Sequence, residues 1–424
     1  MVSRIRWVPI GFLFAGGMIN YMDRAALSVA APLVMRDLGL DAAQLGIIFS
    51  SFFAGYTLFT FIGGYAADIL GPKRVFTLAM TLWSTFCGLT AAAVGFTSLL
   101  VLRTIFGFGE GPFGAAANKM VSNWFPRRQV ATAIGLANAG TPIGGALAGP
   151  VAGWLAVRYG WRTSFVALAG IGFLWTFFWF LIIDDRPPTR KKMSGVERAE
   201  SEGNDLSIAL RESKLPLSFY LRQPTVIATG VSFFGYAYVL YFFLSWFPVY
   251  LTMAQHLNIR DMGFVNSIPW VLGALGLTLS GLVCDLLSRI SNDLLRVRKL
   301  VLVVCLILAA ICVSLTGLFS SLAWAVAFMA AAIFFIYLTG ATYWAIVQET
   351  VPGEHMGATS GFVHLIANCA GIIGPAVTGF IVQATGVFTS AFLLAGGVAF
   401  LGAFLVAIFV KPIVEPPGSY ARST

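Results

Sequence analysis

The chain has 424 residues, of which 58% are hydrophobic and only 11% are charged, and its formal net charge at pH 7 is +9. Soluble domains carry about 25% charged residues, so a soluble protein of this length could not hide so much apolar surface, and lipid is the expected solvent. The basic excess does not indicate nucleic-acid binding, because Lys and Arg gather in a few short connectors. The five cysteines stand singly, without metal-site spacing, so we expect them to be small core residues and expect no metal site.

Stretches long enough to cross a membrane, at about 20 apolar residues each, occupy most of the chain. There are twelve, at 8–32, 43–67, 75–96, 98–121, 129–155, 162–183, 224–252, 262–286, 299–320, 322–349, 357–384 and 387–411. A single long polar segment separates them into two sets of six. The sequence therefore predicts an all-α membrane protein with an N-terminal six-helix bundle (1–183), a linker (184–223), a C-terminal six-helix bundle (224–411) and a tail (412–424).

The distribution of Lys and Arg indicates the orientation. If the N-terminus is cytoplasmic, the outer loops contain only Arg36, Arg158, Arg162 and Arg260, and nearly all other basic residues face the cytoplasm. Basic residues are retained preferentially on the cytoplasmic side of a membrane protein. Both termini, the linker and the tail are therefore expected in the cytoplasm.

The first span contains the stretch NYMDRAAL, residues 20–27, in which Asp23 and Arg24 are adjacent inside an apolar helix. A charged group at the centre of a membrane helix costs about 2.5–3.5 kcal/mol, and such groups usually face a cavity and carry function. Adjacent helical residues point about 100° apart, so each charge needs a partner on another helix. Asn20 shares the face of Arg24, and Tyr21 is also expected to approach the cavity.

The connector after the second span reads GGYAADILGPKRVF, in which Asp68 is followed by the basic pair Lys73 and Arg74. Asp68 can cap or bridge to a neighbouring helix end on the cytoplasmic face. A degenerate copy, GLVCDLLSR, occurs at the matching place in the second half, with Asp285 in the position of the acid. Two copies six spans apart predict a pair of gating loops.

The fourth span contains the other two intramembrane charges, Arg103 and Glu110. They are seven residues apart, hence on one face and separated by about 10 Å. We expect Arg103 to pair with Asp23 and Glu110 to lie near Arg24. One interpretation is a structural network of ion pairs that stabilises the first bundle.

The other interpretation is a transport site. Arg24 offers a planar, permanently charged fork that fits a carboxylate. Asp23 and Glu110 could alternate between charged and neutral forms, because burial disfavours the charge while a nearby cation favours it. An anion bound to Arg24 would weaken its hold on the neighbouring acids, so proton and anion would travel together. Arg103 would support this exchange.

Further polar and aromatic residues within spans complete the candidate pocket. Tyr56 in the second span can donate to a carboxylate or a sugar hydroxyl, with an ordinary core tyrosine as the alternative, and Thr141 lies on the Gly-rich fifth span. The candidates in the second half are Tyr238, Tyr241, Trp344, Gln348, His364 and Asn368. An aromatic ring with flanking amides suits a polyhydroxylated acid.

The fifth and eleventh spans resemble each other. GPVAGWLAVRYGWRTSF begins at residue 149 and GPAVTGFIVQATGVFTSAF begins at residue 374. Six spans separate them, which predicts a parallel repeat of two bundles with a substrate site between them near the bilayer midplane. The alternative is that Gly-Pro helices merely pack closely.

The two copies of the acidic connector resemble the signature loop of the major facilitator superfamily. NYMDRAAL, GYTLFTFIGGYAAD, RTIFGFGEGPFGAAANKMVSNWFPRRQVATAIGLANAG, YFFLSWFPVYL and NCAGIIGPAVTGFI together resemble its anion:cation symporter branch. Bacterial members of this branch include proton-coupled uptake systems for galactonate, glucarate and hexuronates. The resemblance implies that Arg24 binds the substrate carboxylate and that Asp23 and Glu110 couple the proton.

Two positions depart from the sugar-acid carriers of that branch. His364 and Ala237 stand where those carriers often have Asn. The loss of these amides leaves open a less hydroxylated or aromatic carboxylate as the substrate. His364 could alternatively be a second proton-sensitive group.

The sequence thus predicts a secondary transporter in the bacterial inner membrane that imports an organic anion, a sugar acid or related carboxylate, by proton symport through alternating access. The alternative is a proton-coupled exporter or exchanger of organic anions or aromatic carboxylates on the same fold. An enzyme is not expected, because the sequence contains no HExxH, DxD or Walker pattern. The co-transported proton is the only expected cofactor, and the resemblance implies a monomer.

Overall fold

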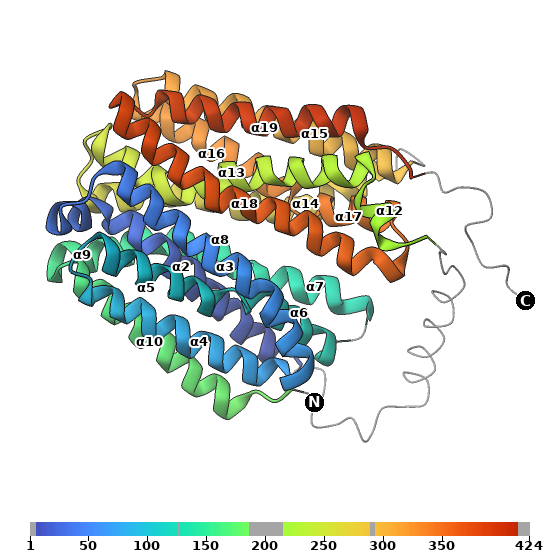
Figure 1. The fold of residues 1–424 in the computed structure, drawn as a ribbon, viewed down its shortest axis with the longest axis horizontal. Helices are drawn as coiled ribbons and strands as arrows, with labels where there is room; N and C mark the ends of the chain where they lie inside the picture. Colours follow the sequence, from blue (N-terminus) through green and yellow to red (C-terminus); the bar gives the residue numbers. More distant parts are fainter. Residues whose placement is uncertain (1–5, 126, 186–214, 289–292, 414–424) are drawn as a thin grey trace, which may run out of the picture.

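The computed structural model describes residues 6–125, 127–185, 215–288 and 293–413, and all regular elements among them are helical. Long, nearly parallel helices form two groups that lie side by side, with the first half of the chain in blue to green and the second in yellow-green to red (Figure 1). The first half comprises α2 (Val8–Leu38), α3 (Ala42–Leu70), α4 (Pro72–Leu89), η1 (Thr90–Ala92), α5 (Phe96–Glu110), α6 (Phe113–Trp124), α7 (Arg127–Asn138), α8 (Gly140–Ala148), η2 (Gly149–Gly153), α9 (Trp154–Tyr159) and α10 (Trp161–Ile182). The second half comprises α12 (Leu217–Leu221), α13 (Pro224–Met253), α14 (Ile259–Ser288), α15 (Leu294–Leu318), α16 (Leu322–Thr339), α17 (Thr342–Thr350), α18 (Gly353–Thr385) and α19 (Thr389–Phe409).

Within these described ranges, nine helices are long and apolar enough to cross a membrane. The other expected spans correspond to α2, to α5 with α6, and to α7 through α9. Asn20, Asp23 and Arg24 lower the hydropathy of α2 near its middle. The other two stretches are broken at Gly111–Pro112 and within the Gly-rich fifth span, because proline lacks the N–H that continues a helix and glycine weakens it.

The first helix is longer than its predicted span, since α2 continues past residue 32 to Leu38. Gly39 then ends it in the left-handed conformation with φ 64°, which glycine adopts without steric cost. Asp41 begins α3 with a capping box, accepting from Gln44 N at 2.8 Å while its own N–H donates to Gln44 Oε1 at 3.1 Å. This tight turn brings α3 back antiparallel to α2.

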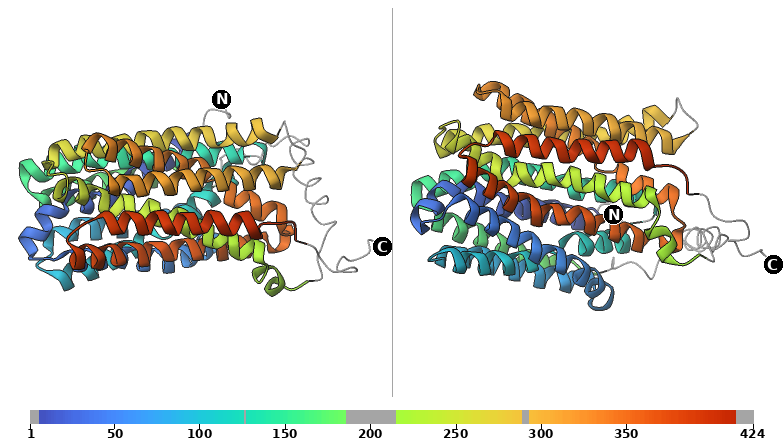
Figure 2. Two further views of the ribbon diagram at one scale, coloured as in Figure 1. Left: turned by 90° about the horizontal axis from the view of Figure 1, so that it is seen from above. Right: turned by 45° about the horizontal axis from the view of Figure 1, so that its top comes forward.

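The two halves meet through a small set of inner helices. α3 packs against α18, α8 and η2 pack against α14, and α2 packs against α13. Two further views show that the axes of the long helices are roughly parallel in both halves (Figure 2). The helices α2 and α18 finish at the same end of the molecule, and α3 and α19 begin there. We call this end the contact end. The described hydrogen bonds between the halves all lie towards it: Ala42 N to Gln383 Oε1 at 3.2 Å, Ala376 N to Ser50 Oγ at 2.9 Å and Ser267 Oγ to Ala146 O at 2.5 Å.

These three hydrogen bonds join the two halves at the contact end. The predicted linker and tail fall largely on residues 186–214 and 414–424, which lie outside the described ranges.

Candidate functional site

The four charged residues predicted within spans are all buried in the first half. The exposed fractions are 1% for Asp23, 7% for Arg24, 2% for Arg103 and 0% for Glu110. Arg24 Nε donates to Glu110 Oε2 at 2.5 Å, so a buried ion pair joins the middle of α2 to the last residue of α5. The two residues lie together as the spacing on the fourth span predicted. The other Glu110 oxygen, Oε1, has no hydrogen-bond partner.

Asp23 faces a different neighbour, as its angular separation from Arg24 requires. Trp83 and Cys87 of α4 lie near its carboxylate, and Arg103 and Glu110 interact with it electrostatically. Neither carboxylate oxygen of Asp23 has a hydrogen-bond partner, and Arg103 Nε and Nη1 also have none. Arg103 thus lies near Asp23 and interacts with it electrostatically, but no described hydrogen bond joins the two side chains.

Three aromatic rings surround the guanidinium of Arg24. Its Cζ atom lies 4.5 Å from the ring centre of Tyr56, 5.1 Å from that of Phe52 and 5.3 Å from that of Tyr21. Cation–π contacts of this kind hold an arginine in place without using its N–H donors. Arginine has five N–H donors. Among the described hydrogen bonds, one of these donors is used, in the bond from Arg24 Nε to Glu110. The remaining donors are available to an anion.

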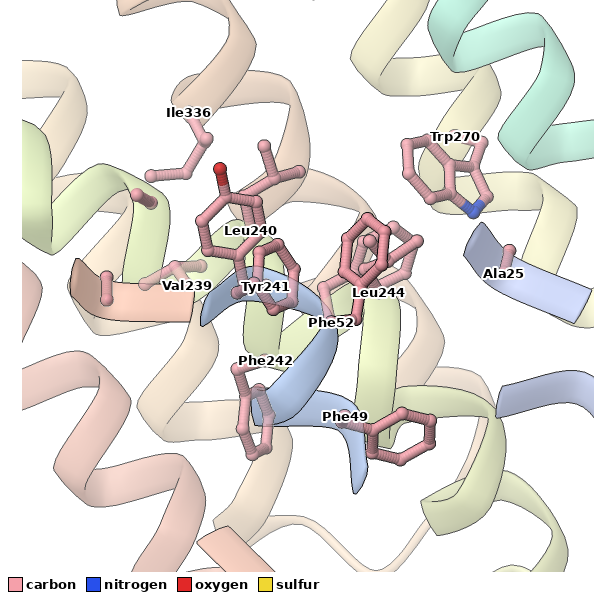
Figure 3. Close-up of a cluster of buried hydrophobic side chains, with 14 of the residues drawn as sticks. Ala25, Phe49, Phe52, Val239, Leu240, Tyr241, Phe242, Leu244, Trp270 and Ile336 are labelled. Atoms are coloured by element: carbon pink, nitrogen blue, oxygen red, sulfur yellow. The ribbon is translucent and has the colours of Figure 1, made fainter. Parts of the chain in front are cut away.

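The second half places Tyr241 and Asn368 opposite this cluster. Tyr241 Oη donates to Asn368 Oδ1 at 3.1 Å, and both side chains are buried. The Tyr241 hydroxyl interacts electrostatically with Arg24, Tyr21 and Tyr56 of the first half. The two halves therefore approach each other here. Figure 3 shows Tyr241, Phe52 and Trp270 in the buried apolar layer around this position.

Tyr337 and Tyr236 belong to the same region, and our sequence reasoning missed them. Tyr337 of α16 is buried, its hydroxyl lacks a hydrogen-bond partner, and this hydroxyl faces Tyr21 of the first half. Tyr236 interacts with Tyr21 and Tyr241. Tyr337 precedes the break between α16 and α17 at Gly340, and a polar ring beside a break within a span was the available signal.

Asn20 lies beside the Arg24–Glu110 pair, whereas the predicted pocket residues His364 and Trp344 contact each other and Phe233. Asn20 is 1% exposed, its Nδ2 has no hydrogen-bond partner, and it approaches Glu110. The His364 ring stacks on Phe233 at 6.0 Å and meets Trp344 edge-on at 5.5 Å. The two rings therefore form an aromatic wall on the second half.

Three other predicted pocket residues make different contacts. Tyr238 lies against Gly374 and near Thr378, both on α18, and its hydroxyl has no partner. Gln348 is exposed. Thr141 Oγ1 donates to the Asn138 carbonyl at 2.8 Å, and its methyl group lies against Gly17. No described contact joins Tyr238, Gln348 or Thr141 to the Arg24 cluster.

The predicted gating loop lies at the end opposite the contact end. Asp68 forms an exposed ion pair with Lys119 of α6 at 2.6 Å. Lys73 donates its backbone N–H to Asp185 Oδ1 at 2.7 Å, and its ammonium pairs with Asp184 at 3.2 Å. The segment that follows α10 thereby caps the start of α4.

The other two residues of the predicted loops add no described contact. Arg74 is exposed. Asp285 falls within α14, but its side chain lies outside the described part of the structure.

Comparisons with known proteins give consistent matches along the whole chain. The family model of the Major Facilitator Superfamily matches residues 13–374. The chain is 46% identical to the hexuronate transporter of Bacillus subtilis (strain 168), covering 100% of this chain and 99% of that protein. It is 30% identical to the D-galactonate transporter of Escherichia coli O6:H1, with 97% of each chain covered. Among solved structures, a D-xylose-proton symporter matches with a TM-score of 0.75 at 15% identity, covering 95% of this chain and 97% of that one, which is a likeness of fold.

Proposed function

Because the chain belongs to the Major Facilitator Superfamily, it is a multi-pass membrane transporter and not an enzyme, and we propose that it imports a hexuronate or a closely related sugar acid together with a proton. The observation that carries this proposal is Arg24, a permanent cation buried where the two halves meet, with N–H donors to spare. The names of the relatives, a hexuronate transporter and a D-galactonate transporter, support the same substrate class.

Coupling between anion and proton follows from the shared arginine. The substrate carboxylate takes the N–H donors of Arg24 that Glu110 does not use, as a bidentate pair of charge-assisted hydrogen bonds. Glu110 is fully buried, and two anions cannot both be neutralised by one guanidinium in a medium of low dielectric. Glu110 therefore takes up a proton when the substrate binds. Asp23, beside Arg103 and without a hydrogen-bond partner, is a second proton carrier.

Recognition of the sugar hydroxyls falls to the second half. Tyr337 has a buried hydroxyl without a partner, and Tyr241 and Asn368 already exchange a hydrogen bond that a sugar hydroxyl can join. The ring faces of Trp344 and His364 suit the apolar C–H face of a pyranose. The phenol hydroxyls of Tyr337 and Tyr241 thus take the place of the amides that His364 and Ala237 do not supply.

Alternating access assigns a conformation to the structure. If both termini lie in the cytoplasm, the contact end faces outwards, and the described hydrogen bonds that join the halves lie on that outer side. On this orientation we infer an inward-facing state. We propose that residues 1–183 and 224–411 rock against each other as units, in the manner of parallel-repeat transporters, with the Asp68 and Asp285 loops at the inner gate. The chain would work as a monomer.

Uptake by proteoliposomes of the purified protein tests the substrate and the coupling together. An inward proton gradient should drive accumulation of radiolabelled D-glucuronate or D-galacturonate above equilibrium, and a protonophore should abolish it. Arg24→Lys should reduce uptake strongly, because lysine keeps the charge but lacks the fork. Arg36→Ala, on the exposed last turn of the same helix, is the matched control and should transport normally.

Two outcomes would overturn the proposal. Uptake that ignores the proton gradient would exclude symport, and normal uptake by Arg24→Lys would remove the arginine from the site. Counterflow without net accumulation would favour the exchanger named above as the alternative.

A further inference from the structure

Two aromatic side chains cross between the halves and enter gaps that only glycine leaves open. A Cβ atom at Gly145 of α8 would lie 2.5 Å from ring atoms of Trp270 of α14. A Cβ atom at Gly371 of α18 would lie 2.4 Å from the ring of Phe53 of α3. Cβ atoms essentially never approach other atoms this closely. Each half therefore inserts one ring into a glycine socket of the other, and the rings are 1% and 2% exposed.

These two contacts are related by the internal repeat of the chain. Phe53 and Trp270 each stand fifteen residues before the acid of a loop copy, Asp68 or Asp285. Each also follows a serine by three residues and a glycine by seven, so that both helices carry the pattern Gly-x3-Ser-x2-aromatic: Gly46, Ser50, Phe53 on α3 and Gly263, Ser267, Trp270 on α14.

The matching glycines and serines make matching contacts. A Cβ at Gly46 would lie 2.6 Å from the Pro375 carbonyl oxygen, and one at Gly263 would lie 2.7 Å from the Gly149 carbonyl oxygen. Both contacts fall on the Gly-Pro segments that the repeat places in the opposite half. Ser50 and Ser267 supply two of the hydrogen bonds between the halves. The whole face is thus duplicated, and its two copies close the contact end from both sides.

Both rings also touch a tyrosine of the candidate site. Trp270 meets the Tyr21 ring edge-on at 5.7 Å, with an interplanar angle of 88°. Phe53 lies 4.2 Å from the Tyr241 ring. Tyr21 in turn covers the guanidinium of Arg24 at 5.3 Å. A movement of either ring out of its socket therefore removes the support of a residue that surrounds the substrate.

We infer that Trp270 and Phe53 are a two-fold-related pair of plugs that seal the contact side of the site and position Tyr21 and Tyr241 while it is sealed. The inference deepens the proposed function, since it rests on alternating access. Opening towards the contact end requires both rings to leave their sockets and meet water, so the sockets favour the inward-facing state. The two plugs act as positioning residues, because neither needs to touch the substrate.

A cysteine at Ser245 reports on the seal. Ser245 of α13 is 4% exposed and lies with Arg24, Phe49 and Phe53 around a space of about 10 Å³, too small for more than one water. A membrane-impermeant methanethiosulfonate reagent added outside intact cells can reach Ser245→Cys only when the contact end opens. The parent chain with its own five cysteines gives the background.

Removing a plug or filling a socket should speed this labelling. Trp270→Ala and Phe53→Ala, which introduce no clash, should each raise the labelling rate about tenfold by shifting the population towards the outward-facing state. Gly145→Ala and Gly371→Ala should do the same by keeping the ring out. Matched controls are Gly135→Ala of α7 and Gly361→Ala of α18, where an added Cβ meets no heavy atom within 4 Å, and their labelling should not change.

A second substitution that restores slow labelling distinguishes a specific ring–glycine contact from a general loosening of the packing between the halves. Trp270→Leu should slow the labelling of Gly145→Ala, because the smaller side chain makes room for the new methyl group, whereas Phe53→Leu should not. Unchanged labelling in the plug and socket variants, or rescue by either leucine alike, would overturn the inference. The labelling measurement needs no substrate. Failure of sugar-acid uptake would therefore overturn the proposed function and leave the inference about Trp270 and Phe53 standing.

Discussion

Replacing Arg24 by alanine removes the only described hydrogen-bond partner of Glu110 and leaves that carboxylate fully buried. Removing one partner of a buried ion pair costs about 3–5 kcal/mol, because the other charge stays uncompensated. The three cation–π contacts of Arg24 are lost as well. A six-helix half should then unfold at a thermal midpoint roughly 6–20 °C lower than in the parent chain, at about 2–4 °C per kcal/mol.

Adding Glu110→Gln to Arg24→Ala separates stability from transport. Glutamine keeps the size of the side chain and removes the orphaned charge, so the double variant should recover most of the lost thermal stability. Uptake should not recover, because the fork that binds the carboxylate is still missing. Two charge-assisted hydrogen bonds at about 1.5–3 kcal/mol each correspond to a loss of affinity of at least about 100-fold.

The assay pairs thermal unfolding of the detergent-purified protein with uptake by proteoliposomes, and Arg36→Ala serves as the control for both readouts. Recovery of uptake together with stability in the double variant would refute this reasoning. The buried ion pair would then be a structural network of the first half. A thermal midpoint of Arg24→Ala equal to that of the parent chain would refute the predicted loss of stability. It would mean that the buried Glu110 side chain does not need Arg24 to compensate its charge.

Glu110→Gln alone should spare counterflow exchange but abolish proton-driven accumulation, and normal accumulation would move the coupling to another acid. Tyr337→Phe should raise the KM for hexuronates about tenfold, which is the usual effect of losing one hydrogen bond to a substrate hydroxyl. The affinity for simple monocarboxylates should not change. Equal losses of affinity for both substrates would contradict a role of Tyr337 in binding the sugar hydroxyls. Asp185→Ala should destabilise the protein by about 1–2 kcal/mol in thermal unfolding, since it removes the cap on the start of α4. Asp184→Ala, which removes only the exposed ion pair with Lys73, should cost no more than about 1 kcal/mol, and equal effects would show that the cap has no special weight.

The buried charges illustrate how far the sequence reaches. Their number, their position within spans and the shared face of Arg103 and Glu110 follow from composition and helical periodicity. The proximity of Arg24 to Glu110, which are 86 residues apart in the chain, was predicted and is found as a hydrogen-bonded pair. The pairing of Asp23 with Arg103 was predicted in the same way, and the two groups interact electrostatically, but no described hydrogen bond joins them. A face identified from spacing does not say which side chain of the opposite helix arrives at bonding distance.

The second half shows the limit more clearly. Tyr238 and Tyr241 are three residues apart on one helix, and both were candidates for the pocket. Only Tyr241 interacts with Arg24, while Tyr238 lies against Gly374 within the second half. Tyr337 was not a candidate, although its hydroxyl faces Tyr21 across the interface. Apolar helices in lipid carry little amphipathic signal, so their sequences do not indicate which face turns towards the substrate.

The sequence by itself determined the membrane environment, the helical class, the family and the presence of a buried cation beside acids, because these depend on composition, on local periodicity and on motifs that lie within single segments. The tertiary structure decided which tyrosines meet Arg24, which acid is left without a partner, and that Phe53 and Trp270 enter glycine sockets of the opposite half. The physical reason is the same in each case. These contacts join residues far apart in the chain, and they depend on how each helix is rotated about its axis when the two halves pack together.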